Sequence, residues 1–322
     1  MLNLSQKASN ISKQKMTLLA VVISLSVLLP IFAFSSHSSK IYVDNDASGD
    51  QDGSASHPYK TIGAAMDKAD NDTEIHISKG TYKENVEIKK GVEIYGSDRD
   101  KVIIKAKHEK DAVIVMNDDT KINKVTIEEG RNGIWVEKKA GASIINCVIK
   151  DNKRNGIQIA SDGTGKERQV YISDSLIKNN GDNGIYAGKR KLSITENEII
   201  KNKADGLILE AGVSAWMADN SIRDNRFSGV KMTLDGSKIW TKNNSIRYNG
   251  REGIEVNFYG GAGRIDIAKS KIVSNNRYGI ARVQRSNFAN SAALWGQNLT
   301  VSQSEFWGNK NGDISGIFHI YN

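Results

Sequence analysis

Aliphatic residues alternate with polar residues in short runs that return along most of the chain. Examples are "GIWVE" at residues 133–137, "GIQIA" at 156–160 and "GIEVN" at 253–257. Aliphatic side chains two positions apart predict β-strands with one buried face. Further runs of this kind lie between them, such as "VYISDS" at 170–175 and "RIDIAKSKI" at 264–272. Each period therefore predicts two or three short strands joined by tight turns, with no room for a helix.

These strands belong to a repeat with the pattern Ile-x-x-Asn-x-x-x-Gly-aliphatic. An imperfect copy has Gly133 and Ile134, with Glu129 in the place of the asparagine. The seven repeat glycines are 22 to 28 residues apart, and a recurring period of this length indicates a repeat architecture. The six intact copies have their glycines at Gly156, Gly184, Gly206, Gly229, Gly253 and Gly279.

The repeat predicts an all-β solenoid in which parallel strands coil, each turn stacking on the last at about 4.8 Å. Equivalent residues then lie above one another. We expect the isoleucines to form an interior stack and the asparagines to stack at a bend. Asparagine tolerates left-handed dihedral angles and hydrogen-bonds its neighbours above and below. We expect the glycines to permit a turn that a side chain would hinder.

The N-terminal segment has a different composition. Lys7, Lys13 and Lys15 precede the mostly apolar run at residues 17–34, a pattern typical of an export signal. Residues 1–35 are a signal peptide cut near Ser35 or an uncut membrane anchor, since the run nearly spans a bilayer. Either interpretation predicts a protein that works outside the cytoplasm, secreted or anchored, touching the membrane only through residues 17–34.

The remaining chain divides into an entry segment and the coils. In residues 36–70 a polar turn is followed by an amphipathic helix from about Tyr59, which we expect to cap the open end of the first coil. Residues 71–322 are predicted to form the coils.

These segments resemble the secreted right-handed parallel β-helix proteins of the pectate lyase-like superfamily. The resemblance covers about residues 40–322 and rests on "GSASHPYKTIGAAMDKA", "ISKGTYKENVEI" and the Asn/Gly coils. It implies a single-stranded right-handed parallel β-helix with a short N-terminal capping helix, and a general link to polysaccharides. The superfamily includes lyases, hydrolases, esterases, epimerases and noncatalytic adhesins, so the fold does not determine the activity.

The characteristic segments of several enzymes in this superfamily are missing. Pectate lyases carry an aspartate-rich calcium set with a "WIDH"-like strand, polygalacturonases "GHG", pectin methylesterases "QDTL" and alginate epimerases "DPH". None is present, so no catalytic residue is transferred from them, and the sequence argues against these activities.

The preferred binding groove is the row of outward positions on the strand after each repeat glycine. Two residues after the glycines stand Trp135, Gln158, Tyr186, Ile208, Lys231, Glu255 and Ala281, and four after them stand Glu137, Ala160, Gly188, Glu210, Thr233 and Asn257. Trp135 and Tyr186 are candidate platforms for sugar rings, since aromatic faces bury ring carbons. Strands also favour aromatic residues without any ligand.

Lys231 and Glu255 occupy the same position on adjacent coils, with Glu210 one coil before Lys231. In a lyase, such a lysine takes the proton beside a uronate carboxylate while arginine or calcium neutralises the charge. The competing interpretation is a stack of ion pairs. The catalytic candidates are Lys231, Glu255, Tyr186 and Arg251, and the substrate-binding candidates are Trp135, Gln158, Glu210, Arg226, Arg277 and Asn257.

Basic residues also recur at fixed positions. Six residues before the glycines stand Lys150, Lys178, Arg223 and Arg247, and two before them stand Arg131, Arg154, Arg251 and Arg277. Stacked like charges repel, and a bound acidic polysaccharide would relieve that repulsion. The alternative is a solvated face balanced locally by Asp151 and Asp224. We expect no nucleic acid, because the protein is exported.

The expectations for metals are limited. One cysteine, Cys147, excludes an intramolecular disulfide and a multi-cysteine zinc site, and the five histidines are scattered without ligand spacing. We therefore expect no metal among the site residues, and calcium is the cofactor left open. The turn "MNDDT" at 116–120 offers oxygen ligands, but Glu210 and Glu255 are two coils apart, about 9.6 Å, too far for two direct ligands of one calcium.

Two functions follow from these observations. The first is an exported β-helix protein that binds, or binds and cleaves, an extracellular acidic polysaccharide, as a lyase or hydrolase if it is an enzyme. The second is a noncatalytic structural or adhesion protein of the cell surface. The missing catalytic segments favour the second, and the habits of the superfamily favour the first.

Overall fold

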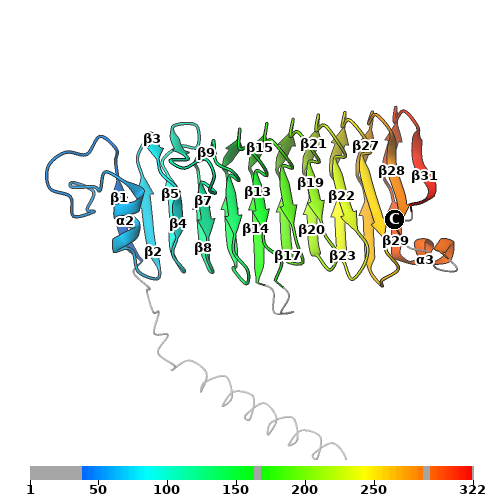
Figure 1. Cartoon of the computed structure of the whole chain (residues 1–322), viewed down its shortest axis with the longest axis horizontal. Helices are drawn as coiled ribbons and strands as arrows, with labels where there is room; N and C mark the ends of the chain where they lie inside the picture. The colour runs from blue at the N-terminus through cyan, green and yellow to red at the C-terminus, as the bar shows by residue number, and fades with distance from the viewer. Residues whose placement is uncertain (1–37, 163–167, 286–290, 321–322) are drawn as a thin grey trace, which may run out of the picture. The chain divides into compact units, whose positions relative to one another are not determined.

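The repeated coils stack into three parallel sheets in the computed structural model, which describes residues 38–162, 168–285 and 291–320 (Figure 1). After the first strand, which is followed by a helix, each coil contributes one strand to each sheet in the order A, B, C. Each strand pairs in parallel with the equivalent strand of the next coil. The coil is right-handed. The predicted single-stranded right-handed parallel β-helix is therefore confirmed.

Sheet A has 11 strands, and it receives the chain after each sheet C strand. Its strands are β1 (Ser39–Val43), β2 (Thr73–Ile77), β5 (Glu93–Gly96), β8 (Thr120–Asn123), β11 (Ala142–Ile145), β14 (Gln169–Ser173), β17 (Lys191–Thr195), β20 (Ser214–Ala218), β23 (Lys238–Lys242), β26 (Arg264–Ala268) and β29 (Leu299–Ser302).

Sheet B has 10 strands that follow those of sheet A after a short turn. They are β3 (Gly80–Lys83), β6 (Val102–Lys105), β9 (Thr126–Glu128), β12 (Val148–Lys150), β15 (Leu176–Lys178), β18 (Glu198–Ile200), β21 (Ser221–Arg223), β24 (Ser245–Arg247), β27 (Lys271–Val273) and β30 (Glu305–Trp307).

Sheet C has 10 strands in the described residues, and the seven from β10 to β28 begin beside the repeat glycines. They are β4 (Val86–Ile88), β7 (Ile114–Met116), β10 (Ile134–Val136), β13 (Ile157–Ile159), β16 (Ile185–Ala187), β19 (Leu207–Leu209), β22 (Val230–Thr233), β25 (Ile254–Phe258), β28 (Tyr278–Gln284) and β31 (Gly312–His319).

The interior consists of stacked aliphatic side chains, as the repeat predicts. The repeat isoleucines from Ile149 to Ile272 are at most 1% exposed and lie in register on sheet B. Their burial removes apolar area from water in every coil, which is the main stabilising contribution in a fold without disulfides.

The repeat asparagines form a buried ladder at the turn between sheets B and C. Each side-chain amide donates to the carbonyl oxygen of the next asparagine at 3.0 to 3.1 Å, from Asn152 through Asn225 to Asn309. The predicted stacking is confirmed. The predicted left-handed geometry is wrong for the asparagines themselves. The preceding residue adopts it instead, for example Lys201, Asp224 and Tyr248 with φ of 55°, 58° and 56°.

The repeat glycines are required by close packing rather than by a positive φ. At Gly206 an added Cβ would lie 2.5 Å from the Gly229 carbonyl oxygen and 2.8 Å from Nδ2 of Asn225. The neighbouring coil occupies the space that a side chain needs, so only glycine fits.

Two helices are present in the described residues, one near each end of the solenoid (Figure 1). Helix α2 (Ile62–Lys68) contacts β1, β2 and β4 and buries Ile62, Ala65 and Met66 in the core. It starts at Ile62 rather than near Tyr59, because the Thr61 side chain accepts a hydrogen bond from the Ala64 amide at 3.1 Å and caps the helix.

Helix α3 (Ser291–Asn298) lies beside β26 and β29. It buries Trp295, which packs edge-on against Phe258 with ring centroids 5.3 Å apart. Within the described ranges, neither helix has the length and apolarity needed to cross a membrane. The predicted leader at residues 1–35 lies outside these ranges.

Candidate functional site

The predicted row of outward residues on sheet C lies in register along the solenoid. Trp135 pairs with Gln158, which is followed by Tyr186, Ile208, Lys231, Glu255 and Ala281 on successive strands. The repeat offset therefore predicts the alignment correctly. Trp135 nevertheless stands four strands from Lys231, about 19 Å by strand spacing, so the row does not form one compact site.

The acidic centre of the row is Glu255, whose side chain is only 12% exposed. It forms ion pairs with Lys231 at 3.5 Å and with Arg285 at 3.6 Å. The Asn257 amide donates to the same carboxylate at 3.0 Å and accepts from Nε of Arg285 at 2.8 Å. This network brings the predicted residues Lys231, Glu255 and Asn257 together with Arg285. The repeat offsets do not select Arg285.

The Glu210 carboxylate has a hydrogen-bond partner on the preceding coil, Tyr186. The Tyr186 hydroxyl donates to this carboxylate at 3.1 Å. Burial, followed by the Glu210 charge, raises the pKa of Tyr186 to about 12, so the phenol stays protonated at neutral pH. Tyr186 and Glu210 therefore form a hydrogen-bonded pair on the two coils before that of Lys231.

A cavity of about 420 Å³ opens at the C-terminal end of this face, where β25, β28 and β31 meet. Its wall contains Arg251, Arg277 and Arg285 together with Glu252 and Glu255, and we call it the arginine cavity. Arg277 pairs with Glu252 at 3.5 Å. Both glutamates thus already have cationic partners.

Arg251 contributes charge without a carboxylate partner within the described residues. Its guanidinium lies 4.1 Å from the ring centroid of Phe227, and that of Arg226 lies 5.7 Å from the same ring. Stacking on an aromatic face orients a guanidinium while leaving its N–H donors available at the edge. The predicted residues Arg251 and Arg277 thus line the cavity, and Arg226 shares the Phe227 ring with Arg251, whereas Trp135 and Gln158 do not line it.

Asp205 lies beneath this face in a second polar ladder, where the coils before it have Asn155 and Asn183. Burial raises the pKa of Asp205, and a hydrogen bond from the Ser228 amide and the charge of Lys231 offset part of the effect.

The basic column on sheet B is balanced by neighbouring acids at two of its four positions in the described residues. Lys150 contacts Glu128 at 2.7 Å and Asp151 at 3.2 Å, and Arg223 contacts Asp224 at 2.6 Å as well as Glu198. The local balance by Asp151 and Asp224 is therefore present at these two positions. Lys178 and Arg247 form no ion pair within the described residues, and the Arg247 guanidinium lies over the Tyr248 ring.

Metal donors do not converge in the part of the chain that the structure describes. No group of three or more His, Cys, Asp or Glu side chains is placed to hold an ion there. In the acidic turn, Asp118 accepts from the Gly141 amide at 2.9 Å and pairs with Arg168 at 3.2 Å. Cys147 is fully buried, which raises its pKa to about 12.

Comparison with protein families gives one match over more than half of the chain. The model of the family described as periplasmic copper-binding protein (NosD) matches residues 68–257. No curated protein matches the sequence.

Several solved structures share the fold at low identity. The A-module of mannuronan C-5 epimerase AlgE4 from Azotobacter vinelandii is 15% identical with a TM-score of 0.56, over 87% of this chain and 100% of the other. Pectate lyase Pel9A is 12% identical with a TM-score of 0.55, over 87% and 79%. The Dettilon tailspike protein is 12% identical with a TM-score of 0.54, over 88% and 62%. Likeness at this identity establishes the fold alone.

Proposed function

Because the chain belongs to the NosD family, described as periplasmic copper-binding proteins, we propose that it works outside the cytoplasm, where its arginine cavity binds an acidic polysaccharide. The observation that carries this proposal is the charge of the cavity. Three arginines face two glutamates that already have cationic partners, so the wall favours additional carboxylates. In this proposal the protein is secreted if residues 1–35 are cleaved off and anchored in the membrane if they are retained.

Copper is a poor fit to the described residues. Copper sites use thiolate, thioether and imidazole donors that converge on the ion. Here Cys147 and the methionines Met66, Met116, Met217 and Met232 are at most 6% exposed and belong to the core. His76 is stacked between Tyr42 and Tyr95 and bonded to Glu74. We therefore derive no copper chemistry for this solenoid.

The ligand class follows from the shape and chemistry of the arginine cavity. Guanidinium groups bind carboxylates through paired N–H donors, and Tyr278 and Phe318, with ring centroids 5.6 Å apart, contribute aromatic surface. A uronate residue combines a carboxylate with apolar ring carbons, which matches this wall. The mannuronan and pectate named for two fold neighbours are polymers of this class, although that likeness concerns the fold.

Binding without cleavage is the form of the proposal that the geometry favours. Lys231 is engaged by Glu255, and Tyr186 is a protonated hydrogen-bond donor to Glu210. Cleavage by a lyase or hydrolase mechanism is the second candidate, because Lys231, Glu255 and Arg251 lie close together at the edge of the cavity. The noncatalytic role includes that of a cell-surface structural or adhesion protein.

The test compares two double variants by calorimetry with polygalacturonate and alginate. Arg251→Ala/Arg277→Ala removes two guanidiniums from the cavity wall. Arg131→Ala/Arg154→Ala removes two from the same repeat position on distant coils and lowers the net charge equally. We expect the first variant to lose at least about tenfold in affinity, the size expected for losing charge-assisted hydrogen bonds, and the second to lose less than about twofold. Equal losses would refute the cavity as the binding site.

The same samples test cleavage. Ultraviolet absorbance from unsaturated uronate ends, together with a reducing-end assay, reports lyase and hydrolase products. New ends that disappear in Lys231→Ala would establish the second candidate. Retention of the polymer without new ends supports binding alone.

A further inference from the structure

Sheet A carries an unexpected row of exposed aromatic side chains on its outer face. The middle outward positions of β14, β17, β20, β23 and β26 lie in register and hold Tyr171, Ser193, Trp216, Trp240 and Asp266. The three aromatic residues are 46%, 44% and 41% exposed, and we call Tyr171, Trp216 and Trp240 the aromatic row. Trp216 and Trp240 stand on adjacent strands, about 4.8 Å apart.

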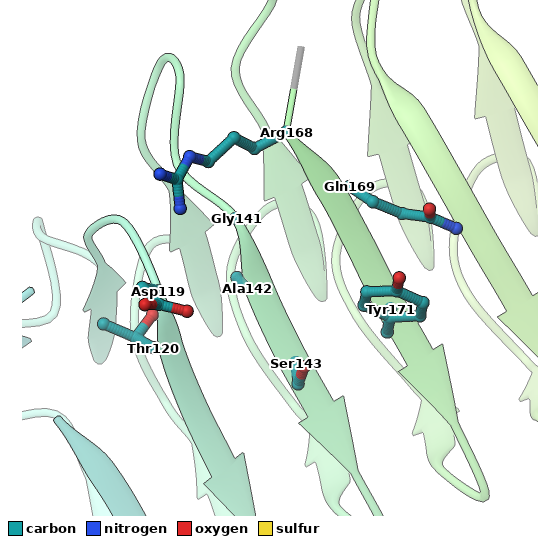
Figure 2. Close-up of a pocket in the computed structure, with 8 residues that line it drawn as sticks. All are labelled: Asp119, Thr120, Gly141, Ala142, Ser143, Arg168, Gln169 and Tyr171. Carbon is teal, nitrogen blue, oxygen red and sulfur yellow. The ribbon is translucent and has the colours of Figure 1, made fainter. Parts of the chain in front are cut away.

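Tyr171 projects between two hollows, one toward each neighbouring coil. The hollow of about 380 Å³ drawn in Figure 2 is lined by Ser143, Arg168 and Gln169 together with the Tyr171 ring. The second, of about 360 Å³, is lined by Ser173, Ser193 and Thr195 with the same ring. The hollows exist because the residues beside Tyr171 in the row are the serines Ser143 and Ser193. Their walls present hydroxyl groups beside an aromatic face.

The positions flanking the aromatic row are positively charged. Lys191 and Lys238 stand on one side of the row and Lys242 on the other, and none of the three forms an ion pair within the described ranges. The acid in the row, Asp266, is bound by Arg264 at 2.7 Å. Within the described residues, the surface therefore has lysines without ion pairs beside exposed rings.

We propose that the aromatic row binds a linear, carboxylate-bearing polysaccharide that runs along the solenoid axis across the strands of sheet A. The negative faces of aromatic rings attract the C–H bonds on the face of a sugar ring. The serine and threonine hydroxyls of the hollows exchange hydrogen bonds with sugar hydroxyls, and the lysines pair with carboxylates. The ligand class rests on the proposed function, whereas the site is separate from the arginine cavity on sheet C.

Single-stranded nucleic acid also suits a surface of aromatic rings and lysines. Two observations favour the polysaccharide. The family is described as periplasmic. Hydroxyl-bearing side chains such as Ser143, Ser193 and Thr195 line the hollows beside Tyr171. The charged groups of the first hollow are the Asp119 carboxylate and the Arg168 guanidinium, which is already paired with Asp118 at 3.2 Å. Nucleic acid is accordingly an outcome of the test.

The experiment measures calorimetric affinities for polygalacturonate, alginate, neutral dextran and a single-stranded DNA oligonucleotide. Three variants of the full chain are compared with the native chain: Trp216→Ala/Trp240→Ala, Arg251→Ala/Arg277→Ala and the control Trp307→Ala. The control removes a 57% exposed tryptophan from sheet B. Circular dichroism checks that each variant folds. We expect the aromatic-row variant to lose at least about tenfold in affinity for an acidic polymer and Trp307→Ala less than about twofold. Polymer binding should also change the tryptophan fluorescence of the native chain, and this change should disappear in the aromatic-row variant.

The outcomes separate the two proposals. If the native chain binds none of the acidic polymers, both are refuted. If Trp216→Ala/Trp240→Ala binds like the native chain while Arg251→Ala/Arg277→Ala does not, the aromatic row is refuted and the arginine cavity stands. The reverse result supports the aromatic row and refutes the cavity. Tighter binding of the oligonucleotide or of dextran than of either acidic polymer overturns the ligand class assigned to the row.

Discussion

Replacing Asn225 with alanine tests whether the asparagine ladder holds the coils together. The Asn225 side chain is 1% exposed and takes part in four hydrogen bonds. Its carbonyl oxygen accepts from the Asn202 amide N–H and from Asn202 Nδ2, both at 3.0 Å. Its own Nδ2 donates to the Ile199 carbonyl and to Asn249 Oδ1, both at 3.1 Å.

The size of the effect follows from the groups left behind. Each lost hydrogen bond costs about 1 kcal/mol, and buried groups left without partners cost about 1–3 kcal/mol each. Because these partners are themselves buried in the ladder, water cannot replace the amide without opening the turn. We expect Asn225→Ala to lower the free energy of unfolding by at least about 4 kcal/mol.

The measurement is urea unfolding followed by circular dichroism and by tryptophan fluorescence. Asn276→Ala is the matched control, since Asn276 is an exposed asparagine in an equivalent turn and makes one hydrogen bond, to the Gly250 carbonyl at 3.2 Å. It should cost less than about 1 kcal/mol. A loss in Asn225→Ala no larger than that of the control would show that the ladder is not a major source of stability.

Three further predictions concern buried groups. Because burial raises the pKa of Asp205, its ionised form destabilises the native state as the pH rises past the unfolded pKa. Asp205→Asn should therefore raise the free energy of unfolding at pH 7, and urea unfolding at lower pH should show this gain shrinking as the pH falls below the aspartate pKa of the unfolded state. Cys147, with a pKa of about 12, should react with a thiol reagent at pH 8 only after unfolding, and equal native and denatured rates would contradict its burial. Residues 38–322 should lose both Cu(I) and Cu(II) to a competing chelator, whereas retention of one stoichiometric ion would reveal a copper site.

The sequence predicted the ladder of repeat asparagines because six copies of the repeat carry the asparagine at the same offset from the glycine. It did not predict which turn residue becomes left-handed. That position holds Asp151, Lys201, Asp224, Tyr248 and Ser274 in different coils, with φ between 55° and 58°. Acidic, basic, aromatic and hydroxyl side chains all occur there, whereas an asparagine with buried hydrogen bonds follows in each case. The turn is therefore determined by the residue after the left-handed one.

Lys231 and Glu255 were predicted together for the same reason, since both stand two residues after a repeat glycine. The aromatic row was not predicted, because the loop from sheet C to sheet A varies in length. Trp216 follows its repeat glycine by 10 residues, Trp240 by 11 and Tyr171 by 15. A fixed offset cannot align these positions, whereas strand pairing does. Arg285 was missed because β28 is longer than most sheet C strands and extends beyond the repeat pattern.

Inward-pointing residues form the core and outward-pointing residues form the surface, which explains how one scaffold carries different surfaces. The core constrains alternate residues of each strand, and the strand register then aligns the remaining residues into rows. On sheet B these residues form ion pairs such as Arg223 with Asp224. On sheet C they build the network of Glu255 and Lys231, and on sheet A they place Trp216 beside Trp240. The inward positions of all three sheets hold mostly aliphatic side chains, so the outer rows differ above a core of one kind. Surface chemistry must therefore be inferred sheet by sheet.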